Sequence, residues 1–266
     1  MRIKLTISYD GTGYAGWQRQ ENALSVQQVV EDALTRLTGA RAAIVGASRT
    51  DAGVHALAQA AHFDTDSRIP PDKFAYALNT MLPPDVRVTA SEAVDGDFHA
   101  RFSATGKRYA YRIWDGPHAS AIYRNLSAHV IYPLDTDLMH REALSLVGRH
   151  DFAAFAASGS AVKDTVRDIY ACAVARGDDG FIVFTVRGKG FLYNMVRIAA
   201  GTLIAVGSLK LAPGAVGRAI QSRDRLDLGP TAPAKGLTLV GVEYGNIVEN
   251  ARSRNACMPQ RTRPEG

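Results

Sequence analysis

The sequence predicts an α+β protein made of two ferredoxin-like halves, each with the element order β-α-β-β-α-β, whose antiparallel or mixed sheets join around a central basic cleft. Segments with strand-like alternation and segments with helical periodicity follow one another in this order twice along the chain. The 266 residues leave room for one large or two modest domains. The composition, 46% hydrophobic and 21% charged, is that of an ordinary globular protein and excludes the disordered and fibrous classes.

Three segments follow from this organisation. We expect a first half over residues 1–104 and a second half over residues 105–246. Residues 247–266 contain four arginines and two glutamates without periodicity, which predicts a loose basic tail.

The first half begins with a strand over residues 2–9, where apolar and polar side chains alternate. A glycine-rich loop follows, and Ser25 is the expected N-cap of a helix whose apolar residues recur at i, i+3, i+4 and i+7 until Gly39. Pro70 and Pro71 are expected to open a second helix, which carries Phe74 and ends before Pro83. The remaining strands of this half are expected near residues 42–47, 55–63 and 86–94.

The second half repeats the order. A strand over 107–114 is followed by a helix over 135–147, and two strands near 165–176 and 180–188 are separated by a glycine-aspartate turn. A long helix is expected from about residue 191 to residue 206. A short helix at 213–222 and a last strand at 237–244 complete the half.

Charge and cysteine content limit the classes of partner and of metal or disulfide site that the sequence allows. The net charge is +5, carried by 24 arginines and 7 lysines. Because the arginine fork suits phosphate, this bias favours a nucleic-acid partner, although GC-rich coding explains it equally well. The two cysteines, Cys172 and Cys257, have no metal-ligand spacing and form no disulfide framework. No targeting segment is visible and the most apolar stretch, 198–206, is too short to cross a bilayer, so we expect a cytoplasmic protein without a metal or a membrane partner.

Two motifs are less informative than they look. Residues 11–16 match G-x-G-x-x-G, but the helix begins near Ser25 instead of at the third glycine, so no helix N-terminus could receive a pyrophosphate. Residues 64–67, Asp-Thr-Asp-Ser, resemble the start of an aspartyl phosphatase. Such an enzyme needs a parallel sheet, and we favour a turn at a strand end.

Three groups of residues carry the candidate chemistry. Residues 48–56, Ser-Arg-Thr-Asp-Ala-Gly-Val-His-Ala, place Arg49 and Asp51 on a loop between two strands. Residues 99–111 interleave cations with aromatic residues, a mixture that suits phosphate contacts combined with base stacking. Residues 191–197 open the long helix and place Arg197 among apolar neighbours, where it needs a carboxylate partner such as Asp51.

Together these groups resemble the tRNA pseudouridine synthase A family, over nearly the whole chain from about residue 2 to residue 244. The resemblance depends on five blocks in the same order, at residues 9–12 with 16–18, 49–56, 99–104, 191–197 and 232–237. One position departs from the family pattern, because Ser48 stands where glycine is usual. If the backbone there needs a positive φ, serine costs on the order of 1 kcal/mol.

The resemblance implies an isomerase that converts uridine to pseudouridine at positions 38, 39 and 40 in the anticodon stem-loop of tRNA, without a metal or other cofactor. It implies that the bond from N1 to C1′ breaks and that the uracil is rejoined through C5. Asp51 matches the essential aspartate, which attacks C1′ or C6 or removes a sugar proton. Arg197 is expected to pair with Asp51 and keep it ionised, and Tyr109 is expected to stack on the base and handle a proton late in the reaction.

The same resemblance suggests residues that bind the substrate. Base flipping is required because the target lies in a stacked stem-loop, and Arg49 is expected to fill the vacated space or hold the flipped nucleotide. Leu237 is expected to form an apolar wall under the uracil. The candidates for contacts to the RNA backbone are Gln18, Arg19, Arg101, Lys107 and Arg108. The family acts as a homodimer on tRNA.

Two alternatives remain open at this stage. A non-catalytic tRNA-binding protein or chaperone would use the same basic surface, and Asp51 distinguishes it, since an inert binder has no use for a carboxylate facing phosphates. A pseudouridine synthase that acts on another RNA would differ at few residues.

Overall fold

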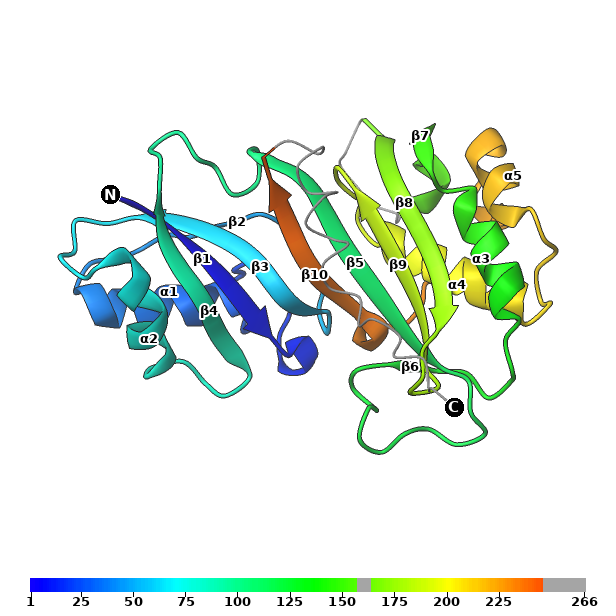
Figure 1. Cartoon of the computed structure of the whole chain (residues 1–266), viewed down its shortest axis with the longest axis horizontal. Helices are drawn as coiled ribbons and strands as arrows, with labels where there is room; N and C mark the ends of the chain where they lie inside the picture. The colour runs from blue at the N-terminus through cyan, green and yellow to red at the C-terminus, as the bar shows by residue number, and fades with distance from the viewer. Residues whose placement is uncertain (157–163, 246–266) are drawn as a thin grey trace, which may run out of the picture.

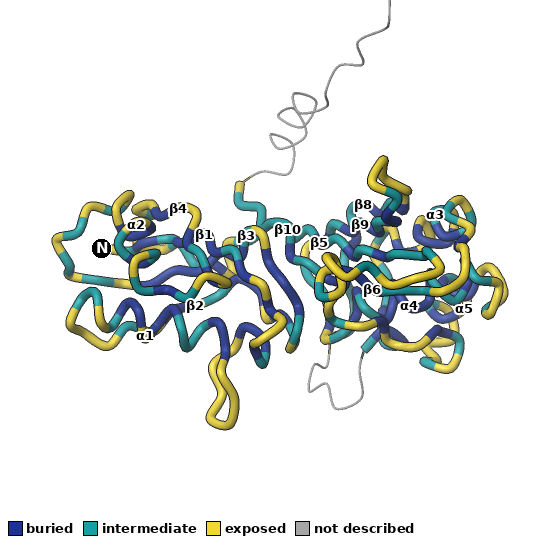
Figure 2. Tube along the Cα trace, turned by 90° about the horizontal axis from the view of Figure 1, so that it is seen from below, coloured by how far each residue is buried: buried dark blue, intermediate teal, exposed yellow. Residues whose placement is uncertain are grey.

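The computed structural model of this protein describes residues 1–156 and 164–245 (Figure 1). The predicted tail over 247–266 therefore lies outside the described residues. The described part is a mixed α+β structure in which one long sheet runs through the molecule, and α1 of the first half and α4 of the second lie on the same side of it (Figure 2). The α+β class predicted from the sequence is confirmed.

The sheet has ten strands in the order β4-β1-β3-β10-β5-β9-β8-β7, with β2 added to β3 and β6 added to β5. Neighbouring strands are antiparallel except at the pairs β3–β10 and β5–β6. The strands are β1 (Arg2–Tyr9), β2 (Val45–Gly46), β3 (His55–Asp64), β4 (Val86–Val94), β5 (Ala104–Trp114), β6 (Ala128–His129), β7 (Gly148–Asp151), β8 (Val166–Arg176), β9 (Ile182–Gly188) and β10 (Leu237–Tyr244).

Five α-helices occur in the described residues: α1 (Val26–Thr38), α2 (Phe74–Asn79), α3 (Thr136–Leu144), α4 (Met195–Gly207) and α5 (Ala215–Ser222). The signals at the ends of α1 act as predicted. Ser25 Oγ accepts a hydrogen bond from the Gln28 amide, and Gly39 ends the helix in the left-handed conformation, with φ of 72°. None of the helices in the described residues is long and apolar enough to cross a membrane.

Several element boundaries differ from the prediction. The strand expected at 42–47 is reduced to two residues, and a single 3-10 turn, Pro71–Lys73, precedes α2 where a longer helix was expected. The helix expected from residue 191 begins at Met195, because Asn194 adopts a left-handed backbone with φ of 60° that no α-helix can include. The short strands β6 and β7 were not predicted.

The last strand joins the two halves. β10 lies between β5, its antiparallel neighbour, and β3, with which it forms two parallel pairs, Thr238 with His55 and Leu239 with Ala56. A single hydrophobic core extends through both halves, from Trp17 and Phe63 in the first to Phe155 and Phe184 in the second. The start of β3 and the start of β10 therefore lie side by side, and the loop that precedes β3 is held at the junction between the halves.

Candidate active site

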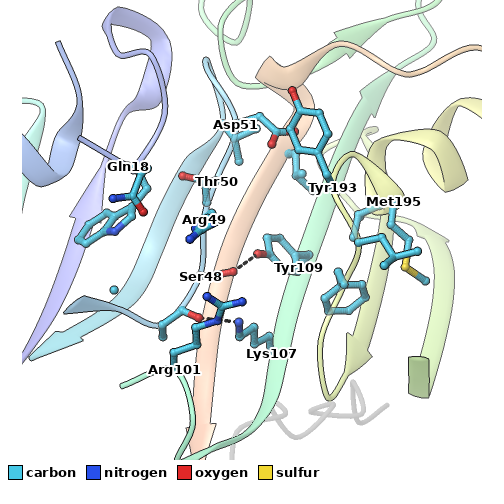
Figure 3. Close-up of a pocket in the computed structure, with 18 of the residues that line it drawn as sticks. Gln18, Ser48, Arg49, Thr50, Asp51, Arg101, Lys107, Tyr109, Tyr193 and Met195 are labelled. Carbon is cyan, nitrogen blue, oxygen red and sulfur yellow. Dashed lines mark hydrogen bonds between the residues drawn. The ribbon is translucent and has the colours of Figure 1, made fainter. Parts of the chain in front are cut away.

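A cavity of about 640 Å³ lies at this junction (Figure 3). Most of its lining comes from the loop at 46–51 before β3, from the loop at 99–102 together with β5, and from residues 191–196 at the start of α4. Further lining residues include Trp17, Gln18, Arg167 and Leu237. These segments include the three groups that the sequence analysis singled out. The structure therefore brings the three groups together around one space.

All four residues at 48–51 of the loop before β3 line the cavity, and their burial alternates along the chain. Ser48 Oγ lies 2.7 Å from Tyr109 Oη, and Thr50 Oγ1 lies 2.7 Å from Tyr9 Oη, all in buried surroundings. Arg49 is exposed and Asp51 is half-buried, and both line the cavity. Two hydroxyl pairs thus hold the loop in the orientation that presents the guanidinium and the carboxylate.

The backbone of this loop is also held from both sides. The Gln59 amide group donates to the Ser48 carbonyl at 2.6 Å and its Oε1 accepts from the Ser48 amide at 3.2 Å. The Trp17 amide donates to the Thr50 carbonyl at 3.0 Å. Ser48 is not among the described non-glycine residues with positive φ, which are Asn194, Leu209 and Arg223. The strain considered for Ser48 is therefore absent.

Asp51 and Arg197 form the ion pair expected from the sequence. Arg197 Nη1 donates to Asp51 Oδ2 at 3.2 Å, and the two side chains are 17% and 16% exposed. The Arg197 Nε donates to the Ala232 carbonyl at 2.9 Å. Burial raises the pKa of the Asp51 carboxyl above its usual value, and Arg197 acts against that rise without cancelling it. Desolvation is therefore the larger influence on the pKa of Asp51, and the ion pair with Arg197 offsets part of it. That Arg197 keeps Asp51 ionised stays a prediction.

Asn194 holds Arg197 in place, and sequence reasoning did not find it. Its Oδ1 accepts from Arg197 Nη1 at 2.8 Å, while its own backbone has φ of 60° and ψ of 0°. Asparagine tolerates this conformation better than most residues. The asparagine at position 194 was therefore the one sequence signal that could have indicated a left-handed residue just before the helix. A strained residue that contacts the ion pair indicates a functional constraint.

Tyr109 and Leu237 form the inner wall. Each side chain is 6% exposed, and both line the cavity. The Tyr109 ring packs edge-to-face against Phe191, with centroids 5.2 Å apart. Burial, together with the nearby Asp51 charge, raises the pKa of the Tyr109 phenol to about 12. At neutral pH Tyr109 is therefore a neutral phenol that can donate a hydrogen bond into the cavity.

Cationic side chains gather at the end of the cavity away from Asp51, where Figure 3 places Arg101 and Lys107 next to each other. Lys107 Nζ donates to the Ala47 carbonyl at 2.6 Å. Burial, and secondarily the Arg101 charge, lowers the pKa of Lys107 to about 8. Arg167, which sequence reasoning missed, also lines the cavity and donates to the carbonyls of Asp164 and Val166. Its position in β8 gave no local signal.

Of the remaining candidates for contacts to the RNA backbone, one lines the cavity and two do not. Gln18 lines the cavity, with its amide nitrogen bonded to Gln27 Oε1 at 2.9 Å. Arg19 does not line it, and its guanidinium pairs with Glu31 at 2.9 Å. Arg108 does not line it either, because alternate residues of a strand point to opposite faces and Lys107 and Tyr109 already point to the cavity side.

The described residues contain no group of three or more His, Cys, Asp or Glu side chains that could hold a metal ion. Within residues 1–156 and 164–245, Asp51 is the one carboxylate that lines the cavity, among the cations Arg49, Arg101, Lys107 and Arg167. Such a site can bind a polyanion and direct a single nucleophilic or basic group at it.

Comparisons with known proteins agree with this chemistry. A family model described as tRNA pseudouridine synthase matches residues 5–103 and 143–245. The tRNA pseudouridine synthase A of Ruminiclostridium cellulolyticum is 52% identical over 243 residues, which cover 91% of this chain and 99% of the relative. That of Acetivibrio thermocellus is 50% identical over 242 residues, with 91% and 99% covered. One chain of a solved Cbf5-Nop10-Gar1 complex aligns with 76% of this chain and over 45% of its own length. The sequence identity is 12% and the TM-score is 0.34, a likeness too weak to carry a conclusion.

Proposed function

This chain belongs to the tRNA pseudouridine synthase family and isomerises uridine to pseudouridine in tRNA, and we propose that Asp51 is its catalytic nucleophile or base. The observation that carries the proposal is that Asp51 is the one carboxylate among the described residues that line the cavity, where the other ionisable groups that carry charge are the cations of Arg49, Arg101, Lys107 and Arg167. A carboxylate facing a phosphate-rich ligand weakens binding, so its place there is explained by chemistry. We propose positions 38, 39 and 40 of the anticodon stem-loop as the targets.

The proposed reaction leaves the composition of the uridine unchanged. Asp51 attacks C1′ or C6, or removes a sugar proton, and the bond from N1 to C1′ breaks with its electron pair going to the uracil. The uracil then turns and a bond forms between C5 and C1′, while any bond to Asp51 breaks or the sugar proton returns. The C5 proton is then released to water and N1 takes up a proton from water, so the proton count of the nucleoside does not change. Tyr109 takes part in moving that late proton and stacks on the uracil, and its phenol can exchange a proton with Ser48 Oγ at 2.7 Å. Arg197 orients Asp51 and limits the rise of its pKa.

The target uridine reaches Asp51 by leaving the stacked stem-loop, which costs a few kcal/mol. We propose that Arg49, exposed on the loop beside Asp51, fills the vacated space or holds the flipped nucleotide. Leu237 forms the apolar wall under the uracil. Gln18, Arg101 and Lys107 contact the RNA backbone, whereas Arg108, on the other side of β5, contacts a different part of the RNA or none.

The proposal for Asp51 is tested by tritium release from tRNA transcripts labelled at uridine C5, because formation of pseudouridine expels that hydrogen. Wild-type protein should release tritium, whereas Asp51→Asn and Asp51→Ala should release none and bind the transcripts as well as wild type or better. Transcripts with uridine at only one of positions 38, 39 and 40 test the targets. Turnover by Asp51→Asn comparable to wild type would contradict the role of Asp51. No release by wild type with binding intact would favour the alternative of a tRNA chaperone.

We also propose that the two halves, 1–104 and 105–246, are ferredoxin-like units that meet at a basic cleft. The strand orders β4-β1-β3-β2 and β10-β5-β9-β8 support this. When the short strands β6 and β7 are left aside, each half has its fourth, first, third and second strand side by side in that order, which is the order of a ferredoxin-like sheet. A cytoplasmic homodimer is the assembly that the family resemblance implies, and its mass in solution, measured by light scattering, tests it.

A further inference from the structure

We propose that Phe102 is a stacking platform for an unpaired nucleobase of the tRNA that is a neighbour of the reacting uridine. The proposal rests on the proposed function, because it needs tRNA in the cavity. Phe102 lies in the loop at 99–102, and its side chain lines the cavity while remaining 77% exposed. Exposed apolar side chains are common on protein surfaces, so exposure alone carries no argument. What distinguishes Phe102 is that its open ring lies at the wall of the cavity, among cationic side chains.

The Phe102 ring is supported from behind. The His99 ring lies 4.3 Å from it with an interplanar angle of 31°, and His99 in turn packs against the buried His62 ring at 4.9 Å. His99 Nδ1 accepts hydrogen bonds from the backbone amides of Arg101 and Phe102, both at 3.2 Å. The loop is closed by the Ser103 amide, which donates to the His99 carbonyl at 2.9 Å. The backbone of the loop is therefore held by hydrogen bonds and the His99 ring supports the Phe102 ring, which lowers the entropic cost of stacking on it.

Cationic side chains near the Phe102 ring could bind the phosphate of a nucleotide whose base stacks on the ring. The Arg101 guanidinium carbon lies over the ring, 5.8 Å from its centroid, and Lys107 lines the same end of the cavity. Cations that bind a phosphate next to an aromatic ring that stacks a base form the combination found where proteins bind single-stranded nucleic acids.

The end of the cavity where Phe102 lies differs from the end that the reacting base would occupy. Figure 3 shows Asp51 at one end of the cavity and Arg101 at the other, with Tyr109 between them. A uracil at Asp51 stacks on the Tyr109 side of the cavity, so the Phe102 ring serves a second nucleotide. Unpaired bases flank the stem of an anticodon stem-loop, and they are available for stacking without further cost of unpairing.

The test measures the affinity for a substrate tRNA transcript over a series of salt concentrations. Phe102→Ala should bind about 5- to 150-fold more weakly, the range that loss of one base–aromatic stack gives. Phe102→Trp should bind as tightly as wild type, and Phe102→Leu, which keeps apolar area without a ring, should bind as weakly as Phe102→Ala. Because stacking involves no counterion release, the dependence of log affinity on log salt should keep its slope in all three variants.

Tyr76 offers a matched control. It is 72% exposed and has a cation over its ring, Lys73 at 5.4 Å, but it lies on α2 and does not line the cavity. Tyr76→Ala should bind tRNA as wild type does. Far-ultraviolet circular dichroism and thermal melting of each variant show that it is folded.

Two results would overturn the proposal. Wild-type affinity of Phe102→Ala would show that the ring contributes nothing, and wild-type affinity of Phe102→Leu would show a plain apolar contact. Failure of the proposed function is seen separately, because wild-type protein would then release no tritium from C5-labelled tRNA whatever the Phe102 variants do. In single-turnover experiments, Phe102→Ala should raise the enzyme concentration needed for half-maximal rate more than it lowers the rate at saturating enzyme, as expected of a residue that acts in binding. A larger loss in the rate at saturation would overturn the assignment of Phe102 to binding.

Discussion

The hydroxyl of Ser48 lies 2.7 Å from the phenol of Tyr109, and both side chains are buried. This bond joins the loop that carries Asp51 to the strand that forms the inner wall of the cavity. Glycine, the residue that the family pattern places at position 48, could not make it.

Removing the Ser48 hydroxyl should therefore affect both stability and chemistry. Ser48→Ala leaves the buried Tyr109 hydroxyl without a partner, which should lower the free energy of unfolding by about 1–3 kcal/mol and reduce kcat more than affinity. Tyr109→Phe should do the same. In the double variant the loss should be smaller than the sum of the two, and urea unfolding of the four proteins measures this coupling. Strictly additive losses would show that the two hydroxyls do not act together.

Lys107 gives the binding of tRNA a dependence on pH. Its pKa is lowered to about 8, so in the free protein it loses its proton as pH rises through this value, and a phosphate contact then requires proton uptake. We expect affinity for tRNA to fall between about pH 7 and pH 9, approaching roughly tenfold per pH unit at the upper end. Lys107→Arg, which stays charged, should give a flatter profile when affinity is measured at constant ionic strength. Identical profiles for the two proteins would exclude Lys107 as the titrating group.

Gly16 supports the loop that carries Asp51. Its φ is +92°, and a side-chain Cβ there would lie 2.5 Å from the Thr50 carbonyl oxygen. Gly16→Ala should displace this loop and abolish most activity. Gly39→Ala is a matched control, because Gly39 also has a positive φ, +72°, with nothing within 4 Å of the added carbon.

We expect Gly39→Ala to cost about 1–2 kcal/mol of stability, the price of a left-handed alanine, with activity retained. Gly16→Ala should cost more stability and lose the tritium release that reports turnover. Normal turnover by Gly16→Ala would show that the loop adapts and that the tight contact has no catalytic consequence.

Asp51 should destabilise the fold when it is ionised. Its pKa is raised in the folded protein, so its contribution to stability is fully present below the pKa of the unfolded chain and is lost as pH rises through the folded pKa. The free energy of unfolding of Asp51→Asn, relative to wild type, should therefore increase as pH rises above the ordinary carboxyl pKa of about 4. Urea denaturation at three pH values measures this difference, and a difference that is constant or falls with pH would contradict the raised pKa.

The elements that the sequence predicted well are those whose cause is local. β1 has the predicted bounds, Arg2–Tyr9, because its alternation is complete within the strand. α1 begins after Ser25 and ends at Gly39, because capping acts within one turn of the helix. The start of α4 was predicted four residues early, since apolar periodicity continues through residues 191–194 and does not reveal that Asn194 leaves the helical conformation to contact Arg197.

In the candidate site, the apolar flanks of Arg197, the motif around Asp51 and the family resemblance together predicted the ion pair, although 146 residues separate the two positions. The sequence by itself thus determined the α+β class, the principal helices and strands, and the residues with reactive side chains. The tertiary structure decided which of those residues share one cavity. It placed β10 between β3 and β5 and put the face of β5 that carries Lys107, not the face that carries Arg108, at the cavity. It also added Arg167 and Asn194 to the site and made burial outweigh Arg197 at Asp51. The insertion of a strand, the choice of the strand face that lines a cavity and the extent of desolvation depend on neighbours that are remote in the chain, and no local pattern of residues encodes them.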